Sequence, residues 1–245
     1  MPELDDIIWA ATIYRDSGGS PSTGAGCQAY VDILNQQAFL EGLRDHPGDL
    51  KVEEIRTILI KFLNRWGCRL RNYDNLTASG LQGCLVKAHP ELSDLREDSI
   101  FDFRLENIEM TERVERLFNG LWHCGSGSTV AANFGPTATS KLLHIMNPDF
   151  FPLWDESIRL AYWKEDDRII ESGRGYCIFM EKLRKVAEHL RTESERRFGP
   201  LGPARLISEK LKIDPPHSLL KFIDEFNWVA YNLGRRRPEG WRSPF

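Results

Sequence analysis

The feature that most constrains this chain is the helical spacing of its apolar residues, which recur every three or four positions along most of its length. In residues 52–66 this pattern is carried by Ile55, Ile58, Leu59, Phe62 and Leu63. We find no alternating pattern of a strand ladder and no internal repeat. The sequence therefore predicts an all-α fold of about ten helices joined by short loops.

Turn residues set the expected bounds of these helices. Gly67 is expected to cap the helix before it, and Pro90 to stop the helix that begins at Leu76. Residues 16–26 and 125–128 are rich in glycine and serine and are expected to be loops, the first of them flexible. The predicted helices span residues 4–14, 28–44, 52–66, 76–88, 111–122, 137–146, 156–164, 176–197, 204–211 and 217–233.

Composition limits the class of protein. With 41% hydrophobic and 28% charged residues, the chain can bury a core, either as one large domain or as two small lobes around a cleft. It has no apolar run of membrane-spanning length, and its acidic first residues do not resemble a signal peptide, so we expect a cytoplasmic protein and no membrane partner. A net charge of −4 argues against a coat of nucleic acid, although binding depends only on the local field.

The cysteines predict neither a disulfide framework nor a metal site. Their number is odd, their spacings are wide, and no CxxC pair occurs, so we expect buried or idle thiols, no metal and no cofactor. The five are Cys27, Cys68, Cys84, Cys124 and Cys177.

The most informative stretch begins at Asn133-Phe134-Gly135-Pro136. Glycine permits a tight turn, and proline suits the first turn of the helix that follows. The free N–H groups of that helix start, with the hydroxyls of Thr137 and Thr139, could bind phosphate, although most helix starts bind nothing. Lys141 and His144 lie on the same helix face as Thr137.

A corner follows this helix. Asn147-Pro148 ends it, Phe150 and Phe151 anchor the turn, and Pro152 leads to Asp155. Asp155 stands where the N-cap of the next helix is expected, so the residue is either a structural cap or a functional carboxylate.

The two pieces together resemble the helix-hairpin-helix superfamily of DNA base-excision glycosylases, in which a glycine hairpin opens a helix and a later corner delivers the catalytic aspartate. The matching positions are Gly135, Ala138, Pro148, Phe151, Pro152, Asp155 and Arg159. Asn133 stands where the hairpin's first glycine would be. Thr137 is nearest to the place of the lysine that bifunctional members use, and Lys141 lies one turn further on.

The resemblance implies two helical lobes around a central cleft and a hydrolase that flips a base out of duplex DNA before excising it. Residues 1–26 would then form an N-terminal helix and flexible loop, and residues 27–124 the first lobe. Residues 125–165 would form a hairpin-like turn and the catalytic-aspartate corner, and residues 166–245 would complete the second lobe. The likeness extends to anti-phage glycosylases that remove glucosylated hydroxymethylcytosine, which makes that base one candidate substrate.

Under this hypothesis Asp155 stabilises the oxocarbenium-like sugar, and Lys141 is either an amine nucleophile or, as we favour for a monofunctional enzyme, a phosphate or solvent contact. Trp154 could stack on the extruded base or pack in the core, and His144 could face the pocket or the core. The loop after residue 64 combines amide, guanidinium and aromatic groups, which suit either a polar pocket or an ordinary loop. The further candidates for the base pocket are Asn64, Trp66, Arg69, Arg71 and Tyr73.

The expected partner is double-stranded DNA bound by a monomer. Candidate contacts to its backbone are Asn133, Gly135, Thr137, Thr139, Arg235, Arg236 and Arg237, and the three arginines are equally compatible with a solvated tail. The alternative function is a non-catalytic helical module that binds DNA or protein. A toxin-like nuclease, which would need paired acids and a metal, is a weaker third hypothesis.

Overall fold

The computed structural model describes residues 1–17, 25–70, 74–124, 134–163 and 172–243, and within these ranges it is all-helical, which confirms the predicted fold class. The described residues form eleven helices when residues 52–65 are counted as one. Their bounds are α1 Leu4–Asp16, α2 Ala25–Leu34, α3 Gln37–Asp45, α4 Val52–Glu54, η1 Ile55–Ile60, α5 Lys61–Arg65, α6 Asn75–Asp94, α7 Ile108–Trp122, α8 Gly135–Met146, α9 Glu156–Tyr162, α10 Gly173–Phe198, α11 Pro203–Leu211 and α12 Leu219–Tyr231. Across the described ranges, none of these helices combines the length and the apolar character needed to cross a membrane.

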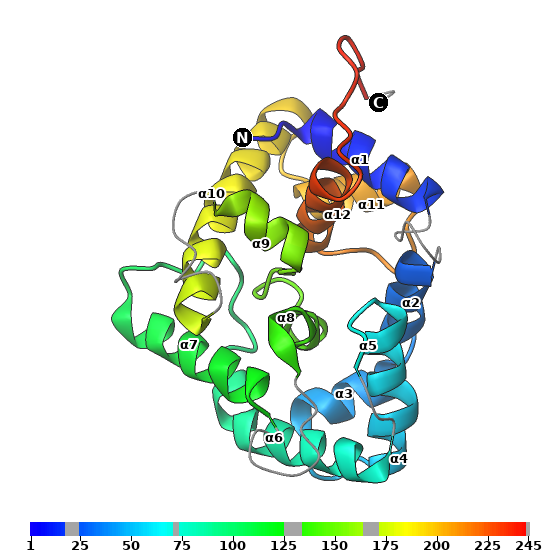
Figure 1. Ribbon diagram of the computed structural model, residues 1–245. Helices are drawn as coiled ribbons and strands as arrows, with labels where there is room; N and C mark the ends of the chain where they lie inside the picture. The colour runs from blue at the N-terminus through cyan, green and yellow to red at the C-terminus, as the bar shows by residue number, and fades with distance from the viewer. Residues whose placement is uncertain (18–24, 71–73, 125–133, 164–171, 244–245) are drawn as a thin grey trace.

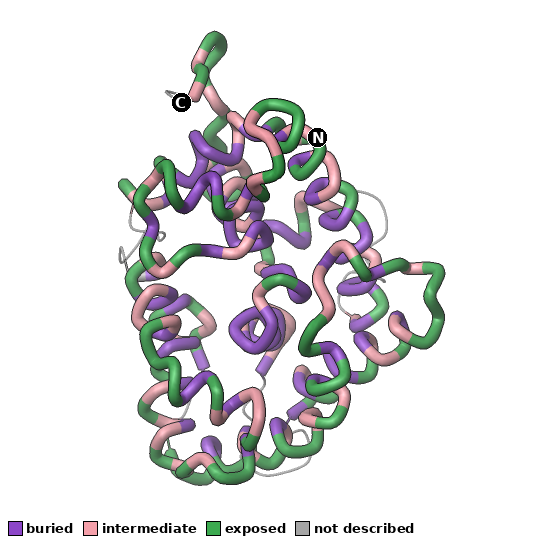
Figure 2. The backbone as a smooth tube through the Cα atoms, turned by 180° about the vertical axis from the view of Figure 1, so that it is seen from behind, coloured by how far each residue is buried: buried purple, intermediate pink, exposed green. Residues whose placement is uncertain are grey.

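Helix α8 lies at the centre of the fold. Figure 1 shows it in the middle of the view, with α7 on one side, α5 on the other and α3 below. Eight of its twelve residues are buried, and Figure 2, which views the molecule from behind, shows this buried coil inside a ring of helices that each expose one side. The two predicted features on either side of α8, the turn at Gly135 and the corner at Asp155, are therefore held by the core of the molecule.

Two of the predicted helices differ from the observed ones by more than a few residues. The single helix expected over 28–44 is interrupted between α2 and α3, where Gln36 leaves the helical region with a ψ of 54°. Pro90 does not stop α6, which runs through it to Asp94. A proline removes only one N–H and its hydrogen bond, and α6 packs against α7, α3, α4 and η1, so tertiary contacts outweigh the local cost.

Gly67 confirms its predicted role as a helix cap. Its φ is 87°, its N–H donates to the Asn64 carbonyl at 3.0 Å, and the N–H of Cys68 donates to the Leu63 carbonyl at 3.0 Å. This double hydrogen bond is a Schellman motif, which needs a left-handed residue at the position of the glycine. The motif fixes the end of α5 and with it the backbone of Trp66.

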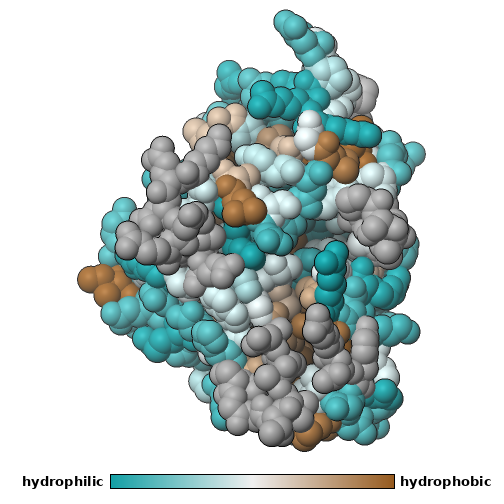
Figure 3. All heavy atoms as spheres, in the orientation of Figure 1, coloured by the Kyte–Doolittle hydropathy of each residue, from teal (hydrophilic) through white to brown (hydrophobic). Residues whose placement is uncertain are grey.

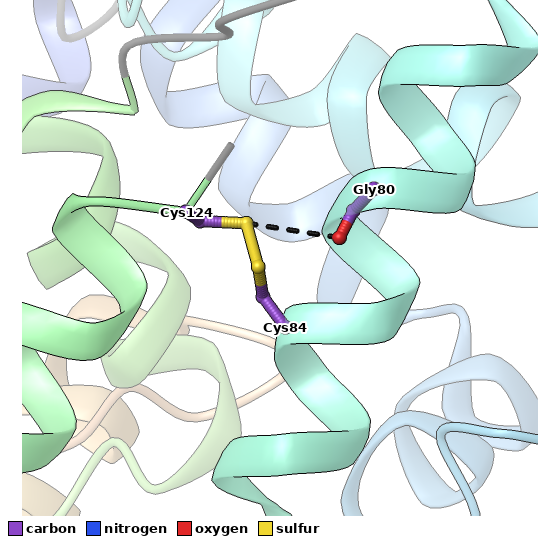
Figure 4. The surroundings of a disulfide bond; sticks show 3 residues. All are labelled: Gly80, Cys84 and Cys124. Atoms are coloured by element: carbon purple, nitrogen blue, oxygen red, sulfur yellow. Dashed lines mark hydrogen bonds between the residues drawn. A yellow bond between two sulfur atoms is a disulfide. The ribbon is translucent and has the colours of Figure 1, made fainter. Parts of the chain in front are cut away.

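The cysteine prediction is wrong for two of the five residues. Cys84 of α6 and Cys124, just after α7, form a disulfide that spans 40 residues of sequence, as Figure 4 shows. In the same view the Cys124 sulfur lies 3.8 Å from the carbonyl oxygen of Gly80. Sequence spacing alone did not indicate the pair because the packing of α6 against α7 is what brings the two residues together. The thiols of Cys27, Cys68 and Cys177 are free.

Candidate functional site

Asp155 combines a structural role with accessibility. It is the N-cap of α9, and its Oδ1 accepts a hydrogen bond from the Ile158 N–H at 3.0 Å. The residue is half-buried, and among the described residues its other carboxylate oxygen accepts no hydrogen bond. One oxygen therefore holds the carboxylate in place while the other remains available to a ligand.

The corner that carries Asp155 is fixed from both sides. The Trp154 N–H donates to Ser140 Oγ of α8 at 3.0 Å, and the Tyr176 hydroxyl of α10 donates to the Pro152 carbonyl at 2.7 Å. Nδ1 of His144 lies 2.8 Å from the Phe151 carbonyl oxygen. These contacts fix the position of the Asp155 carboxylate through the core of the molecule.

A buried ionic cluster on and near α12 adjoins this corner, since α9 packs against α12. Lys221 Nζ lies 3.0 Å from Asp224 Oδ2 and 3.2 Å from Glu225 Oε1. His217 Nδ1 lies 3.2 Å from the same glutamate oxygen. The side chains of Lys221 and Glu225 are 0% exposed and that of Asp224 is 12% exposed. Asp224 is thus the acid through which this cluster reaches the surface.

The charges in the cluster shift one another's pKa values. Burial alone would lower the pKa of the Lys221 ammonium, but the acidic groups around it, Tyr14, Glu225 and Asp224, raise it well above its ordinary value. Burial raises the pKa of Glu225, but Lys221 and His217 outweigh it, and the net direction is downward. For Asp224 burial is the largest effect and the pKa is raised, with Asp155 raising it further and Lys221 and Lys141 opposing.

An aromatic wall surrounds the buried ammonium. Lys221 Nζ lies 4.2 Å from the ring centre of Tyr14 in α1, 5.4 Å from that of Tyr30 in α2 and 5.9 Å from that of Trp66. Lys141 of α8 approaches Trp66 from outside: its Nζ lies 5.1 Å from the ring centre and donates to the Trp66 carbonyl oxygen. Cation–π contacts of this kind stabilise charges that have left water.

The structure therefore assembles a site that the sequence indicated only in part. Asp155 and Lys141 were predicted, and both act electrostatically on Asp224. The α12 cluster and two of its aromatic neighbours, Tyr14 and Tyr30, were not predicted from the sequence, whereas the third, Trp66, was. The available signal was the placement of Lys221, Asp224 and Glu225 at spacings of three and four within an otherwise apolar helix, which predicts ionic groups directed into the core.

Three predicted site residues require correction. Trp154 is 0% exposed and packs against Phe118, Tyr176 and Phe179, so it cannot stack on an extruded base. Thr139 is 0% exposed and its hydroxyl donates to the Gly135 carbonyl at 2.9 Å, which removes it from any phosphate contact.

His144 is the third. It is fully buried, with Nε2 3.1 Å from the Tyr30 hydroxyl and Nδ1 at the Phe151 carbonyl. Burial lowers its pKa to about 3, so it is a neutral structural histidine rather than a wall of a base pocket.

The remaining residues of the predicted base pocket differ in accessibility. Trp66 is 6% exposed, and the ammonium groups of Lys141 and Lys221 both lie within 6 Å of its ring centre. Asn64 uses Oδ1 to accept the Leu70 N–H at 2.5 Å, which closes the turn after α5. Arg69 is exposed, with a φ of 51°. Arg71 and Tyr73 lie outside the described residues.

The predicted contacts to the DNA backbone also differ in accessibility. Gly135 has a φ of 65°, a left-handed conformation at the start of α8 that glycine adopts readily. Thr137 is partly exposed, and its hydroxyl accepts a hydrogen bond from Arg159 at 3.2 Å. Asn133 and the loop 125–128 lie outside the described residues.

Arg237 is a further correction, because acidic side chains of the N-terminus already pair with it. Its guanidinium lies 2.9 Å from Glu3, 3.4 Å from Asp5 and 2.8 Å from Asp6, so its charge is neutralised within the protein. Figure 1 shows the C-terminal segment leaving α12 beside α1, which explains the encounter. Arg235 and Arg236 are exposed.

The surface around the site is mainly polar. In Figure 3 the described residues on the face seen in Figure 1 are mostly hydrophilic, with the hydrophobic residues in small separate groups. A hollow of about 340 Å³ is lined by residues of α2, η1 and α5, among them Asp32, Thr57 and Arg65, and not by Asp155. Within the described ranges, no three or more His, Cys, Asp or Glu side chains gather as ligands for a metal.

The geometry thus brings together one accessible capping carboxylate, a second carboxylate tied to a buried ammonium, and a lysine held against an indole ring. Such a pair of acids in unequal environments is typical of sites that perform acid–base chemistry, although structural ion pairs perturb pKa values as well. In comparisons with known proteins, the chain matches no protein-family model, no curated protein and no solved structure.

Proposed function

We propose that this protein is a DNA glycosylase that hydrolyses the N-glycosidic bond of a modified or damaged base flipped out of duplex DNA. The observation that carries the proposal is Asp155, a half-buried residue whose carboxylate is fixed by the α9 cap through one oxygen, while the other accepts no hydrogen bond from the described residues. The order of the glycine turn, the central helix and the aspartate corner, which resembles that of the helix-hairpin-helix glycosylases, supports it as well.

The proposal includes the finer architecture. Helix α8 would be the helix that follows the DNA-binding hairpin, and α9 the helix that the catalytic aspartate caps. The flipped nucleotide would enter a cleft between two helical lobes, with the sugar beside Asp155. Arg69, Arg235 and Arg236, which are exposed, remain candidates for contacts with the base or the DNA backbone.

In the proposed reaction, positive charge develops on the sugar as its bond to the base breaks. A carboxylate fixed in advance beside the anomeric carbon stabilises this charge without reorganising and can accept a proton from the attacking water. Lys141 supports monofunctional hydrolysis rather than lyase chemistry, because its ammonium is engaged by the carbonyl and ring of Trp66, whereas a nucleophilic amine must be neutral and free.

Base release from defined DNA tests the proposal. The wild-type protein is incubated with duplexes that contain only normal bases, uracil, 5-hydroxymethylcytosine or glucosylated 5-hydroxymethylcytosine, and the small-molecule fraction is analysed by mass spectrometry. We expect a free base from at least one modified duplex and strand cleavage only after alkali. No base from any duplex would contradict the proposal. Cleavage without alkali together with a borohydride-trapped adduct would contradict monofunctional hydrolysis and indicate Lys141 as the nucleophile.

One observation favours the alternative of a non-catalytic helical binding module. Asp155 accepts the capping hydrogen bond of α9, and this structural role alone can explain an aspartate at the start of a helix. Under this alternative the protein would bind duplex DNA or a protein partner without releasing a base, and replacing Asp155 by asparagine would leave binding unchanged.

A further inference from the structure

We propose that Asp224 is a second catalytic acid of the same site, which gives a proton to the departing base, so that the substrates are neutral bases that must be protonated in order to leave. This inference rests on the proposed glycosylase function and extends it to the leaving group. It also assigns a role to the ionic cluster on α12, which a mechanism with Asp155 alone does not require.

The first support is position. Asp224 lies on α12, which packs against α9, the helix that Asp155 caps. The charge of Asp155 raises the pKa of Asp224, and the charge of Lys141 lowers it. Its side chain is 12% exposed, whereas those of Lys221 and Glu225 behind it are 0% exposed. Asp224 is therefore the member of the cluster that a ligand at Asp155 could touch.

The second support is the balance of charge. Lys221 supplies one ammonium to two carboxylates, those of Asp224 and Glu225, and His217 adds a further contact only to Glu225. Glu225 therefore keeps its charge, and a proton is bound most favourably on Asp224, where Asp155 adds like-charge repulsion. The titratable groups that act on Asp224 or are acted on by it are Lys221 of its own helix, Asp155 at α9, Lys141 of α8, Tyr14 of α1 and Tyr30 of α2.

The proposed step is balanced in atoms and electrons. The bond between C1′ and the base nitrogen breaks with its electron pair moving to the base, and the Asp224 carboxyl transfers its proton to a ring nitrogen or carbonyl oxygen of that base. Water then bonds to C1′ and loses a proton to the Asp155 carboxylate. The products are a hydroxyl on the sugar and a neutral base, and the proton moves from Asp155 through solvent to restore Asp224. The two acids thus act in opposite protonation states, which their unequal environments favour.

The pH dependence of base release is the first test, with the wild-type protein and the duplex that it acts on. Because Asp224 must carry a proton and Asp155 must not, the rate is expected to be bell-shaped in pH and to fall about tenfold per unit on the alkaline side. In Asp224→Asn the rate should be lower by about a hundredfold or more and the alkaline fall should be absent. Asp49→Asn, a change at an exposed turn, is the matched control and should retain the wild-type profile.

A second measurement does not require activity. Carboxyl carbon resonances of the wild-type protein are titrated by NMR, and the Asp224 signal is assigned by its absence in Asp224→Asn, or by its replacement in Asp224→Glu should the asparagine variant not fold. The proposal expects this group to titrate above the ordinary aspartate value of about 3.9.

The outcomes separate the two proposals. Absence of base release by the wild-type protein would refute the glycosylase function and this inference with it. Base release with no alkaline fall, an unchanged alkaline limb in Asp224→Asn, or an Asp224 resonance that titrates like an ordinary aspartate would refute the role of Asp224 alone.

Discussion

At the scale of single residues, Lys221 determines the character of the site. A fully buried ammonium is tolerated only where acids and aromatic rings replace the lost water, and here Asp224, Glu225 and Tyr14 provide them. Removal of one partner from such a pair leaves a buried charge uncompensated, which is a strong constraint on how the cluster can vary. The cluster is thus part of the core as well as of the proposed active site.

The burial of His144 leads to a prediction about the stability of the folded protein at acid pH. Its pKa is about 3 in the folded protein, mainly through burial, against an ordinary value of 6.5. The unfolded chain therefore binds a proton below pH 6.5 that the folded protein refuses, and stability is lost as the pH falls from 6.5 toward 3. The contribution of His144 to the change of the free energy of unfolding with pH approaches about 1.4 kcal/mol per pH unit.

Urea unfolding between pH 8 and 4 measures this slope for the wild-type protein and for His144→Gln, which cannot take up the proton. We expect a shallower loss of stability in the variant, and no such change in the control His46→Gln, at the exposed end of α3. Equal slopes for His144→Gln and wild type would show that His144 is not the buried neutral histidine described above.

At the scale of elements, substitutions at two glycines test how closely α10 approaches α7. A Cβ added to Gly173 would lie 2.6 Å from the Glu115 carbonyl oxygen, so Gly173→Ala must push the start of α10 away from α7. We expect a loss of about 1–3 kcal/mol in the free energy of unfolding, as for other overpacked sites. Gly120→Ala is the matched control, because Gly120 is an exposed residue within α7 and a Cβ added there would meet no atom of another described element within 4 Å.

The free energy of unfolding of Gly120→Ala should rise by up to about 1 kcal/mol, since alanine forms helices better than glycine does. Chemical denaturation of both variants checks the pair of values. A neutral or stabilising Gly173→Ala would mean that α10 does not approach α7 as closely as described.

Local patterns predicted most of the helices, and long-range contacts explain the failures. The period of apolar residues and the cap at Gly67 are properties of neighbouring residues, and both were predicted correctly. The helix predicted over 111–122 begins three residues earlier, at Ile108, because Asn107 is the N-cap of α7. The continuation of α6 through Pro90 depends on helices that pack against it, which no short window contains.

The candidate site was predicted only where one segment carries it. Asp155 and Lys141 belong to a continuous stretch, so their spacing was informative. Tyr14 and Lys221 are separated by most of the chain and meet only because α1 packs against α12. The burial of Trp154 could not be read from its position next to Asp155, since it depends on Tyr176 and Phe179 of α10.

At the scale of the whole molecule, we expect the Cys84–Cys124 disulfide to stabilise the folded protein. It closes a loop of 40 residues, and chain-entropy arguments give a contribution of about 4 kcal/mol for a loop of this length. Reductant should therefore lower the denaturant midpoint of the wild-type protein, and Cys84→Ser with Cys124→Ser should show the lower value with or without reductant. A wild-type midpoint that reductant does not change would contradict the bond.

The central claim is that Asp155 is more than a helix cap, and Asp74 provides a control for it. Asp74 caps α6 by accepting the Thr77 N–H at 2.8 Å, as Asp155 caps α9 at 3.0 Å. Asparagine is an equally good N-cap, so Asp74→Asn and Asp155→Asn should each change stability by less than about 1 kcal/mol.

The decisive measurement is the rate of base release by these two variants, from the duplex on which the wild-type protein acts. The account predicts wild-type release by Asp74→Asn and no detectable release by Asp155→Asn, with both proteins folded. Wild-type release by Asp155→Asn would contradict it and leave the aspartate as a cap alone.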